Sequence, residues 1–147
     1  MSLDLTQAEA DELIAMEKHF IGNEKYNWPS LGTKIAIPLS STDGREEFVL
    51  DIATSALKIS KLTIQNRARV TTVLVRLDVD GPPHRNPDDV EIPCPHIHVF
   101  KEGFADKWAF PLPKDVFTNL SDKRVIYMEF ASYCKIVLPP ILEQGLF

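Results

Sequence analysis

The chain has 147 residues, of which 44% are hydrophobic and 25% are charged, and its net charge is −5. This is the length of one ordinary domain with its own core, so we expect a single domain over residues 1–147. The negative charge excludes a general nucleic-acid coat, which needs an excess of positive charge. No apolar run approaches the roughly 20 residues of a membrane span, and the two cysteines form no disulfide or metal-finger pattern. We therefore expect a cytoplasmic protein without a membrane partner.

The first predicted element is a helix that begins at Thr6. Thr6 and Glu9 have the spacing of a capping box, in which each side chain binds a free backbone amide of the other residue. Apolar residues then recur at helical intervals as far as Ile21, before Gly22 and Asn23 end the pattern. We expect this helix to pack on a sheet and to take no part in chemistry, with a loop over 26–32 after it.

Strands follow from Lys34, because apolar and polar residues now alternate with a period of two. The turn sequence Ser41–Gly44 predicts a hairpin. The next strand is expected over 56–65, where a change of parity near Ser60 indicates a bulge. The longest strand is predicted over 70–79.

The rest of the chain returns from strand to helix. A connection rich in proline follows residue 80, and an extended run resumes at Ile97. Residues 108–112 predict a short edge strand, because Pro111 cannot donate a ladder hydrogen bond. A final helix is expected from about Asp122 to Tyr133, with Ser121 as its cap and an apolar tail docked after it.

These elements predict an α+β fold. We expect a strongly bent, mainly antiparallel sheet of five or six strands, approaching a barrel in its most closed form. An N-terminal and a C-terminal helix flank this sheet.

Histidines and charged groups gather around the proline-rich connection. Arg76 and Asp78 share one face at the end of a strand, His84 lies in the connection, and His96 and His98 share one face of the next strand. Antiparallel pairing of these strands would bring all five to one end of the sheet. One imidazole can then deprotonate a 2′-hydroxyl of RNA while another protonates the leaving oxygen, without a metal or other cofactor. The residues predicted to be catalytic are Asp78, His84, His96 and His98.

Positive charge gathers in the middle of the chain. Between Thr54 and Leu77 there is no acid, and there are five Lys or Arg residues: Lys58, Lys61, Arg67, Arg69 and Arg76. One interpretation is an ordinary solvated sheet face. The other is a landing surface for the RNA backbone beside the histidines. In that second interpretation the substrate-binding residues are Arg67, Arg69, Arg76 and Lys107.

Two families share motifs with this chain. The segments 76–84 and 92–98 resemble the core of the TumE-like toxin family, in which an Arg-x-Asp strand leads to a Pro-His turn and then to Pro-His-x-His. That resemblance implies a nucleic-acid-directed activity, a protein antitoxin as partner, and roles for Arg76, Asp78, His84, His96 and His98. The whole chain is also similar to a family of uncharacterised bacterial and prophage proteins. The motifs that carry this second similarity are Asp80–Pro87, Pro93–His98 and Asp106–Ala109.

Two alternatives to the RNA hypothesis stay open. His96-x-His98 followed by Glu102 resembles the first metal motif of cupins, and Asp78 and His84 are further candidate ligands. In the other alternative the protein is a non-catalytic binding or oligomer-forming module, and its histidines only bind local carbonyls. Imidazoles that face a cleft beside Arg76 or Lys107 would favour catalysis or metal binding. The sequence does not determine the oligomeric state.

Overall fold

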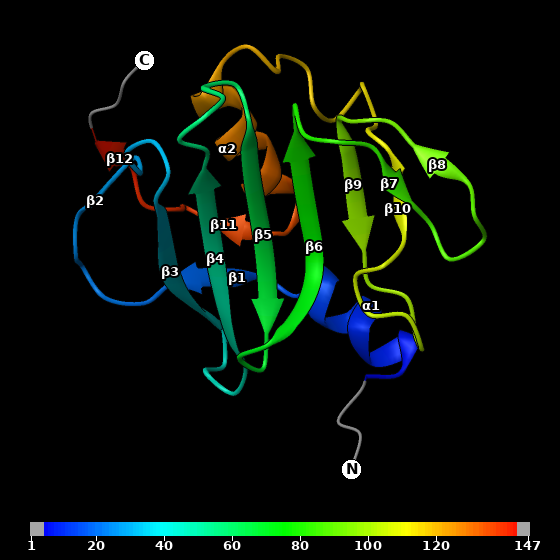
Figure 1. Ribbon diagram of the computed structural model, residues 1–147. Coiled ribbons are helices and arrows are strands. Elements are labelled where there is room, and N and C mark those ends of the chain that lie inside the picture. Colours follow the sequence, from blue (N-terminus) through cyan, green and yellow to red (C-terminus); the bar gives the residue numbers. More distant parts are fainter. Residues whose placement is uncertain (1–4, 144–147) are drawn as a thin grey trace.

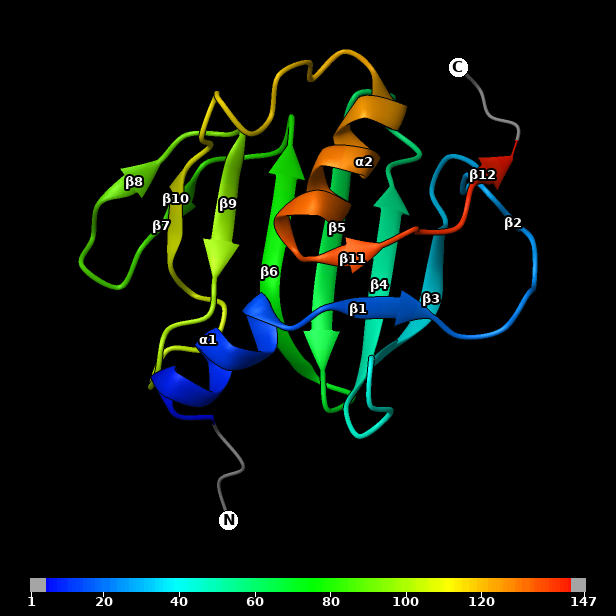
Figure 2. The same cartoon turned by 180° about the vertical axis from the view of Figure 1, so that it is seen from behind.

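Two helices lie on one face of a large curled sheet in the computed structural model, which describes residues 5–143 (Figures 1 and 2). The helices are α1 (Gln7–Ala15) and α2 (Lys123–Tyr133). The sheet forms a half-barrel of eight strands in the order β10-β9-β6-β5-β4-β3-β1-β11. These strands are β1 (Lys18–Phe20), β3 (Lys34–Ser41), β4 (Glu47–Thr54), β5 (Leu62–Ala68), β6 (Thr72–Val79), β9 (His96–Val99), β10 (Ala109–Pro111) and β11 (Ile136–Val137). Two separate pairs join β2 (Tyr26–Asn27) to β12 (Leu142–Glu143) and β7 (His84–Arg85) to β8 (Glu91–Ile92).

The predicted α+β class is confirmed, but the predicted number of five or six strands in the sheet is too small. The sheet is antiparallel except for the parallel pair of β1 with β11. These two short strands account for the difference, because β1 lies inside the segment predicted as helix and β11 directly follows α2. No helix within residues 5–143 is long and apolar enough to cross a membrane.

The first helix ends six residues earlier than predicted. The Thr6–Glu9 capping box is present as expected, but Met16 already has an extended backbone with φ −71° and ψ 136°. Lys18 then pairs with Ser41 of β3 and with Ile136 of β11. The apolar residues near Phe20 fit the helical period, yet pairing with two strands overrides this local preference.

The core lies between the sheet and the helices, on the face that Figure 2 presents. Alternate residues of the central strands are fully buried there, and they include Ile37, Leu39, Leu50, Ile52, Leu62, Ile64 and Leu77. Helix α2 adds Ile126 and Phe130 to this layer. The opposite face of the sheet carries no helix (Figure 1), and its side chains are mostly polar.

The predicted bulge is at the wrong place. Residues 56–61 form a turn rather than a strand, and the register shift lies between Asn66 and Arg67 of β5. Asn66 is opposite Val75 and Arg67 is opposite Val73, so Leu74 is the extra residue. Leu74 and Val75 are both buried, and Arg76 and Asp78 remain together on the open face.

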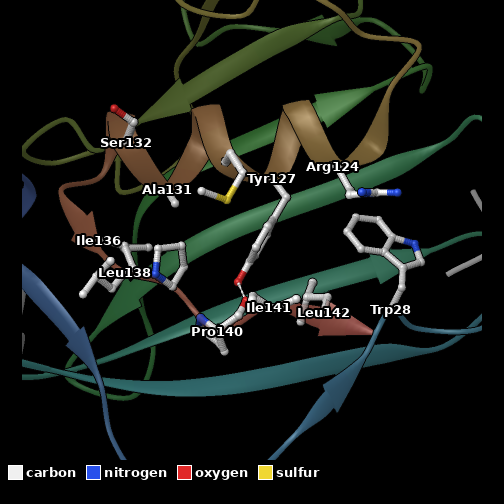
Figure 3. A pocket seen from close by; sticks show the side chains of 12 residues that line it. Trp28, Arg124, Tyr127, Ala131, Ser132, Ile136, Leu138, Pro140, Ile141 and Leu142 are labelled. Atoms are coloured by element: carbon white, nitrogen blue, oxygen red, sulfur yellow. Dashed lines mark hydrogen bonds between the residues drawn. The ribbon is translucent and has the colours of Figure 1, made fainter. Parts of the chain in front are cut away.

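The segment after α2 runs back along this helix. Asp122, one residue after the predicted cap, accepts hydrogen bonds from the amides of Arg124 and Val125. After α2 the chain returns along the helix to pair Leu142 with Tyr26, so that an apolar hollow of about 700 Å³ is left beside Tyr127 (Figure 3). The predicted docking of the tail therefore applies to Leu142, whereas Gln144–Phe147 lie outside the described residues.

Candidate functional site

Three histidines and an aspartate meet where β6 ends and β9 begins. The antiparallel pairing of these strands places Arg76 opposite His98 and Asp78 opposite His96. The His84 ring, from the connection between the two strands, lies 4.6 Å from the His98 ring and 6.1 Å from the His96 ring, measured between centroids. The His96 and His98 rings are 4.9 Å apart. The structure thus brings together the five residues around which the sequence hypothesis was built.

The connection is fastened to the strand ends by Cys94. Its thiol donates to the Asp78 carbonyl at 3.2 Å and accepts the Gly81 amide at 3.1 Å. A cis peptide bond joins Cys94 to Pro95. Cys94 therefore links the end of β6 to the start of β9 and has a local structural role.

The two strand histidines share one hydrogen-bonding pattern. His96 Nδ1 faces the Pro93 carbonyl oxygen at 3.3 Å, and His98 Nδ1 faces the Asp106 carbonyl oxygen at 2.8 Å. A carbonyl can only accept, so each Nδ1 is the donor when it bonds to its carbonyl. The opposite nitrogens, Nε2 of both rings, point at Asp78 Oδ2 from 3.3 and 3.2 Å. Both histidine side chains are almost completely covered, with 3% and 1% of their surface exposed.

Asp78 is the centre of this cluster. Its Oδ1 accepts the Thr63 hydroxyl at 2.8 Å, and its Oδ2 accepts Arg76 Nε at 3.3 Å. Burial by itself would raise the pKa of the Asp78 carboxyl, but the hydrogen bond from His98 and the charge of Arg76 outweigh burial and hold that pKa well below its usual value. Asp78 is therefore ionised at neutral pH.

The His96 ring behaves differently. Burial lowers its pKa, and the neighbouring Asp78 charge opposes this effect only in part. Neutral His96 has one ring proton for two acceptors, the Pro93 carbonyl and the Asp78 carboxylate, each 3.3 Å away, so it presents an Nε2 lone pair when that proton is on Nδ1.

Arg76 bridges the cluster to the loop after β9. Its Nη1 donates to Asp106 Oδ2 at 2.7 Å, and its Nη2 lies 3.1 Å from His98 Nε2. The guanidinium thus has two carboxylate partners, Asp78 and Asp106. Arg76 is about one quarter exposed, so it reaches the pocket surface as well.

His84 is the least buried of the three clustered imidazoles. Its Nε2 donates to the Lys107 carbonyl oxygen at 2.7 Å, which leaves a lone pair on Nδ1. Lys107, predicted to bind substrate through its charge, contributes this backbone acceptor to the cluster.

The clustered side chains line a pocket of about 260 Å³ on the face of the sheet that the helices leave open. Its other walls include Lys61, Thr63 and the Gly81–Pro83 turn. A second polar hollow of about 360 Å³ continues across β4 and shares Thr63, Arg76 and Asp78 with the first. A polar substrate could therefore extend from the histidines across the sheet.

The predicted basic landing surface is not continuous, because acids from other parts of the chain neutralise most of it. Lys58 pairs with Asp80 at 2.8 Å, and Arg67 pairs with Asp51 at 2.7 Å. Arg69, in the turn at the opposite end of β5, pairs with Glu46 at 3.2 Å. Arg67 lies on the open face of the sheet beside the second hollow, where it shares Asp51 with Gln65, whereas Arg69 lies away from the histidines at the far end of β5.

The structure also locates the candidate metal ligands. Asp78, His96 and His98 each place a ligand atom within 4.8 Å of the other two, and within residues 5–143 no other group of at least three Asp, Glu, His or Cys residues does so. Glu102, the third residue of the cupin resemblance, instead accepts the Gln7 amide at the start of α1. Glu102 is therefore not part of this cluster in the structure, and the cupin-like alternative stays a prediction.

Asn86 is the residue that sequence reasoning missed. Its side-chain amide donates to the Ala109 carbonyl at 2.9 Å and accepts the Ala109 amide at 2.8 Å, as a neighbouring strand would. Asn86 is buried and follows His84 by two residues, so it fixes the His84 connection to β10. The sequence signal for this role was the position of Asn86 between His84-Arg85 and Pro87, in the connection that carries the candidate site.

Replacing Asn86 with alanine should loosen the His84 connection. Both backbone groups of Ala109 would lose their partners in a buried place, at a cost of about 2–3 kcal/mol in the free energy of unfolding. Urea denaturation measures this loss, with the exposed Asn23→Ala as control. Equal stability of the two variants would contradict the proposed fastening.

The fold and the cluster together define a protein class: an α+β chain with a His-Asp-Arg pocket on the open face of a curled sheet. Residues 5–136 match a family of unknown function (DUF6978), and the chain belongs to that family. This agrees with the expected similarity to an uncharacterised family, while the TumE-like resemblance stays a prediction. Searches of curated proteins and of solved structures found no match.

Proposed function

We propose that the protein cleaves phosphodiester bonds of RNA in the pocket around His84, His96 and His98, by acid/base chemistry without a metal. The observation that carries the proposal is the convergence of three imidazoles with Arg76 and Asp78 in one polar pocket. Imidazoles are the side chains best suited to exchange protons near neutral pH. The resemblance of this segment to TumE-like toxins supports a nucleic-acid substrate and a protein antitoxin as partner.

His84 is the proposed base. It is the most accessible imidazole of the cluster, and the Lys107 carbonyl holds its proton on Nε2, so Nδ1 can accept a proton from the 2′-hydroxyl. The freed 2′-oxygen attacks the adjacent phosphorus, and the bond from phosphorus to the 5′-oxygen breaks. The products are a 2′,3′-cyclic phosphate and a 5′-hydroxyl.

His98 is the proposed acid. In its protonated form, Nδ1 donates to the Asp106 carbonyl and Nε2 donates to Asp78, so both ring protons have acceptors. The proton on Nε2 passes to the departing 5′-oxygen. Arg76 and Lys61, which line the same pocket, stabilise the charge on the phosphate, and His96 holds Asp78 in place when the ring proton of His96 is on Nε2.

The test is incubation of the purified protein with total cellular RNA, with and without a chelator. We expect cleavage in both conditions and a loss of about 100-fold or more in His84→Ala and His98→Ala, the usual contribution of a general acid or base. His19→Ala is the matched control, because this fourth histidine lies on β1 and contacts Thr42.

Absence of cleavage by the wild-type protein in both conditions would remove the proposal. Cleavage that survives in His84→Ala would refute the role of His84 as base. Cleavage that requires an added metal would replace the metal-free chemistry.

A further inference from the structure

We propose that Asp78, His96 and His98 also form a binding site for one divalent transition-metal ion, and that Arg76 is the cation that competes with this ion. The site goes beyond the proposed RNA cleavage, in which no metal takes part.

Both strand histidines are oriented as metal ligands usually are. A ligating imidazole commonly donates its second nitrogen to a backbone carbonyl or a carboxylate, which fixes the tautomer and directs the remaining lone pair at the metal. His96 donates Nδ1 to the Pro93 carbonyl, and His98 donates Nδ1 to the Asp106 carbonyl. In each neutral ring that has its proton on Nδ1, the Nε2 lone pair is consequently directed at one point beside Asp78.

Two of the three separations between the ligand atoms fit a tetrahedral ion, and all three lie within 4.8 Å. Two ligand atoms at about 2.0–2.1 Å from a tetrahedral metal are about 3.3–3.4 Å apart. His96 Nε2 and His98 Nε2 lie 3.3 and 3.2 Å from Asp78 Oδ2. Both nitrogen–oxygen separations are thus close to those around a bound ion.

The cluster also has an electrostatic reason to take a cation. Two imidazole lone pairs and a carboxylate repel one another when they converge in a covered site. Arg76 offsets this for two of the atoms, because its guanidinium lies 3.1 Å from His98 Nε2 and 3.3 Å from Asp78 Oδ2. Among the described residues, the group within hydrogen-bonding distance of His96 Nε2 is Asp78 itself, whose carboxylate has no proton to donate to a lone pair.

Arg76 has a second carboxylate partner besides Asp78. Asp106 accepts Arg76 Nη1 at 2.7 Å, so the guanidinium can move away from Asp78 and stay paired. Two imidazoles and one carboxylate favour zinc, cobalt or nickel over the hard ions magnesium and calcium. The fourth ligand position would face the pocket that His84 lines.

The test measures metal binding directly, in the absence of RNA. Chelator-treated full-length protein is titrated with Zn²⁺ by calorimetry, and with Co²⁺ while the visible spectrum is recorded. We expect one ion per chain, a tetrahedral Co²⁺ spectrum, and affinity for Zn²⁺ lower by about 100-fold or more in His96→Ala. His19→Ala should bind as the wild type does.

The variant Arg76→Met distinguishes a specific effect on metal binding from a loss of binding caused by misfolding. Removing the competing charge should tighten Zn²⁺ binding by about 10-fold, and a gain of affinity cannot come from an unfolded chain. The proposal is wrong if Zn²⁺ does not bind, if His96→Ala binds as the wild type does, or if Arg76→Met binds more weakly.

The readout also separates the two proposals. Binding without RNA cleavage supports the metal site and removes the nuclease, whereas cleavage without binding does the opposite. If both hold, bound Zn²⁺ should inhibit cleavage, because it withdraws Asp78 and the His98 Nε2 lone pair from proton transfer.

Discussion

Replacement of Asp78 with alanine should lower the free energy of unfolding by about 3–4 kcal/mol and abolish both RNA cleavage and metal binding. The carboxylate receives contacts from Thr63, Arg76, His96 and His98. Removing one member of a covered ionic cluster leaves its partners uncompensated, which costs several kcal/mol. Urea denaturation followed by circular dichroism measures the loss.

Two further variants make the Asp78 prediction specific. Asp78→Asn keeps the shape and can donate from its amide to one His Nε2, so it should recover part of the stability and none of the cleavage or metal binding. Asp115→Asn, at an exposed acid outside the cluster, should behave as the wild type. Full cleavage by Asp78→Asn would show that the carboxylate charge is not needed.

Replacement of Lys18 with methionine should lower the free energy of unfolding by a comparable amount, about 2–5 kcal/mol, without a direct effect on the pocket. Lys18 is completely buried, and its ammonium donates to the carbonyls of Ile14, Met16 and Cys134 at 3.0, 2.9 and 2.8 Å. These acceptors lie at the end of α1, in the turn to β1 and at the end of α2. Methionine has a similar volume but leaves all three without a donor.

The Lys18 prediction is checked by thermal and urea denaturation, with the exposed Lys25→Met as control. Burial lowers the pKa of Lys18 to about 8, so the group is already less firmly protonated than an ordinary lysine. Unchanged stability in Lys18→Met would mean that the three carbonyls find other partners. Refolded Lys18→Met should cleave RNA as the wild type does under conditions where both are folded.

Local sequence patterns were sufficient for much of the sheet. The alternation in β3, β4 and β6 and the turn at Ser41–Gly44 fixed the central strands, because each strand buries one face. The same patterns predicted helix over the whole of β1, because the residues near Phe20 fit the helical period, and the pairing of β1 with two neighbouring strands overrides this. The position of the bulge depends on Leu74 of β6, which is the extra buried residue opposite β5. The sequence of β5 alternates regularly and therefore does not indicate the bulge.

By itself, the sequence determined which polar residues would meet: the order Arg76, Asp78, His84, His96, His98 requires only that β6 and β9 pair antiparallel. Only the tertiary structure decided how they meet. Two imidazoles are buried and point toward one carboxylate oxygen. Asp106 contacts Arg76 and Asn86 contacts Ala109, and no local sequence pattern predicts either contact. The tertiary structure also neutralises much of the predicted basic surface, because Asp51, Glu46 and Asp80, from other parts of the chain, form ion pairs with its charges. The physical reason is that burial and ion pairing depend on which strands become neighbours, and a one-dimensional pattern specifies only which face of its own strand a residue occupies.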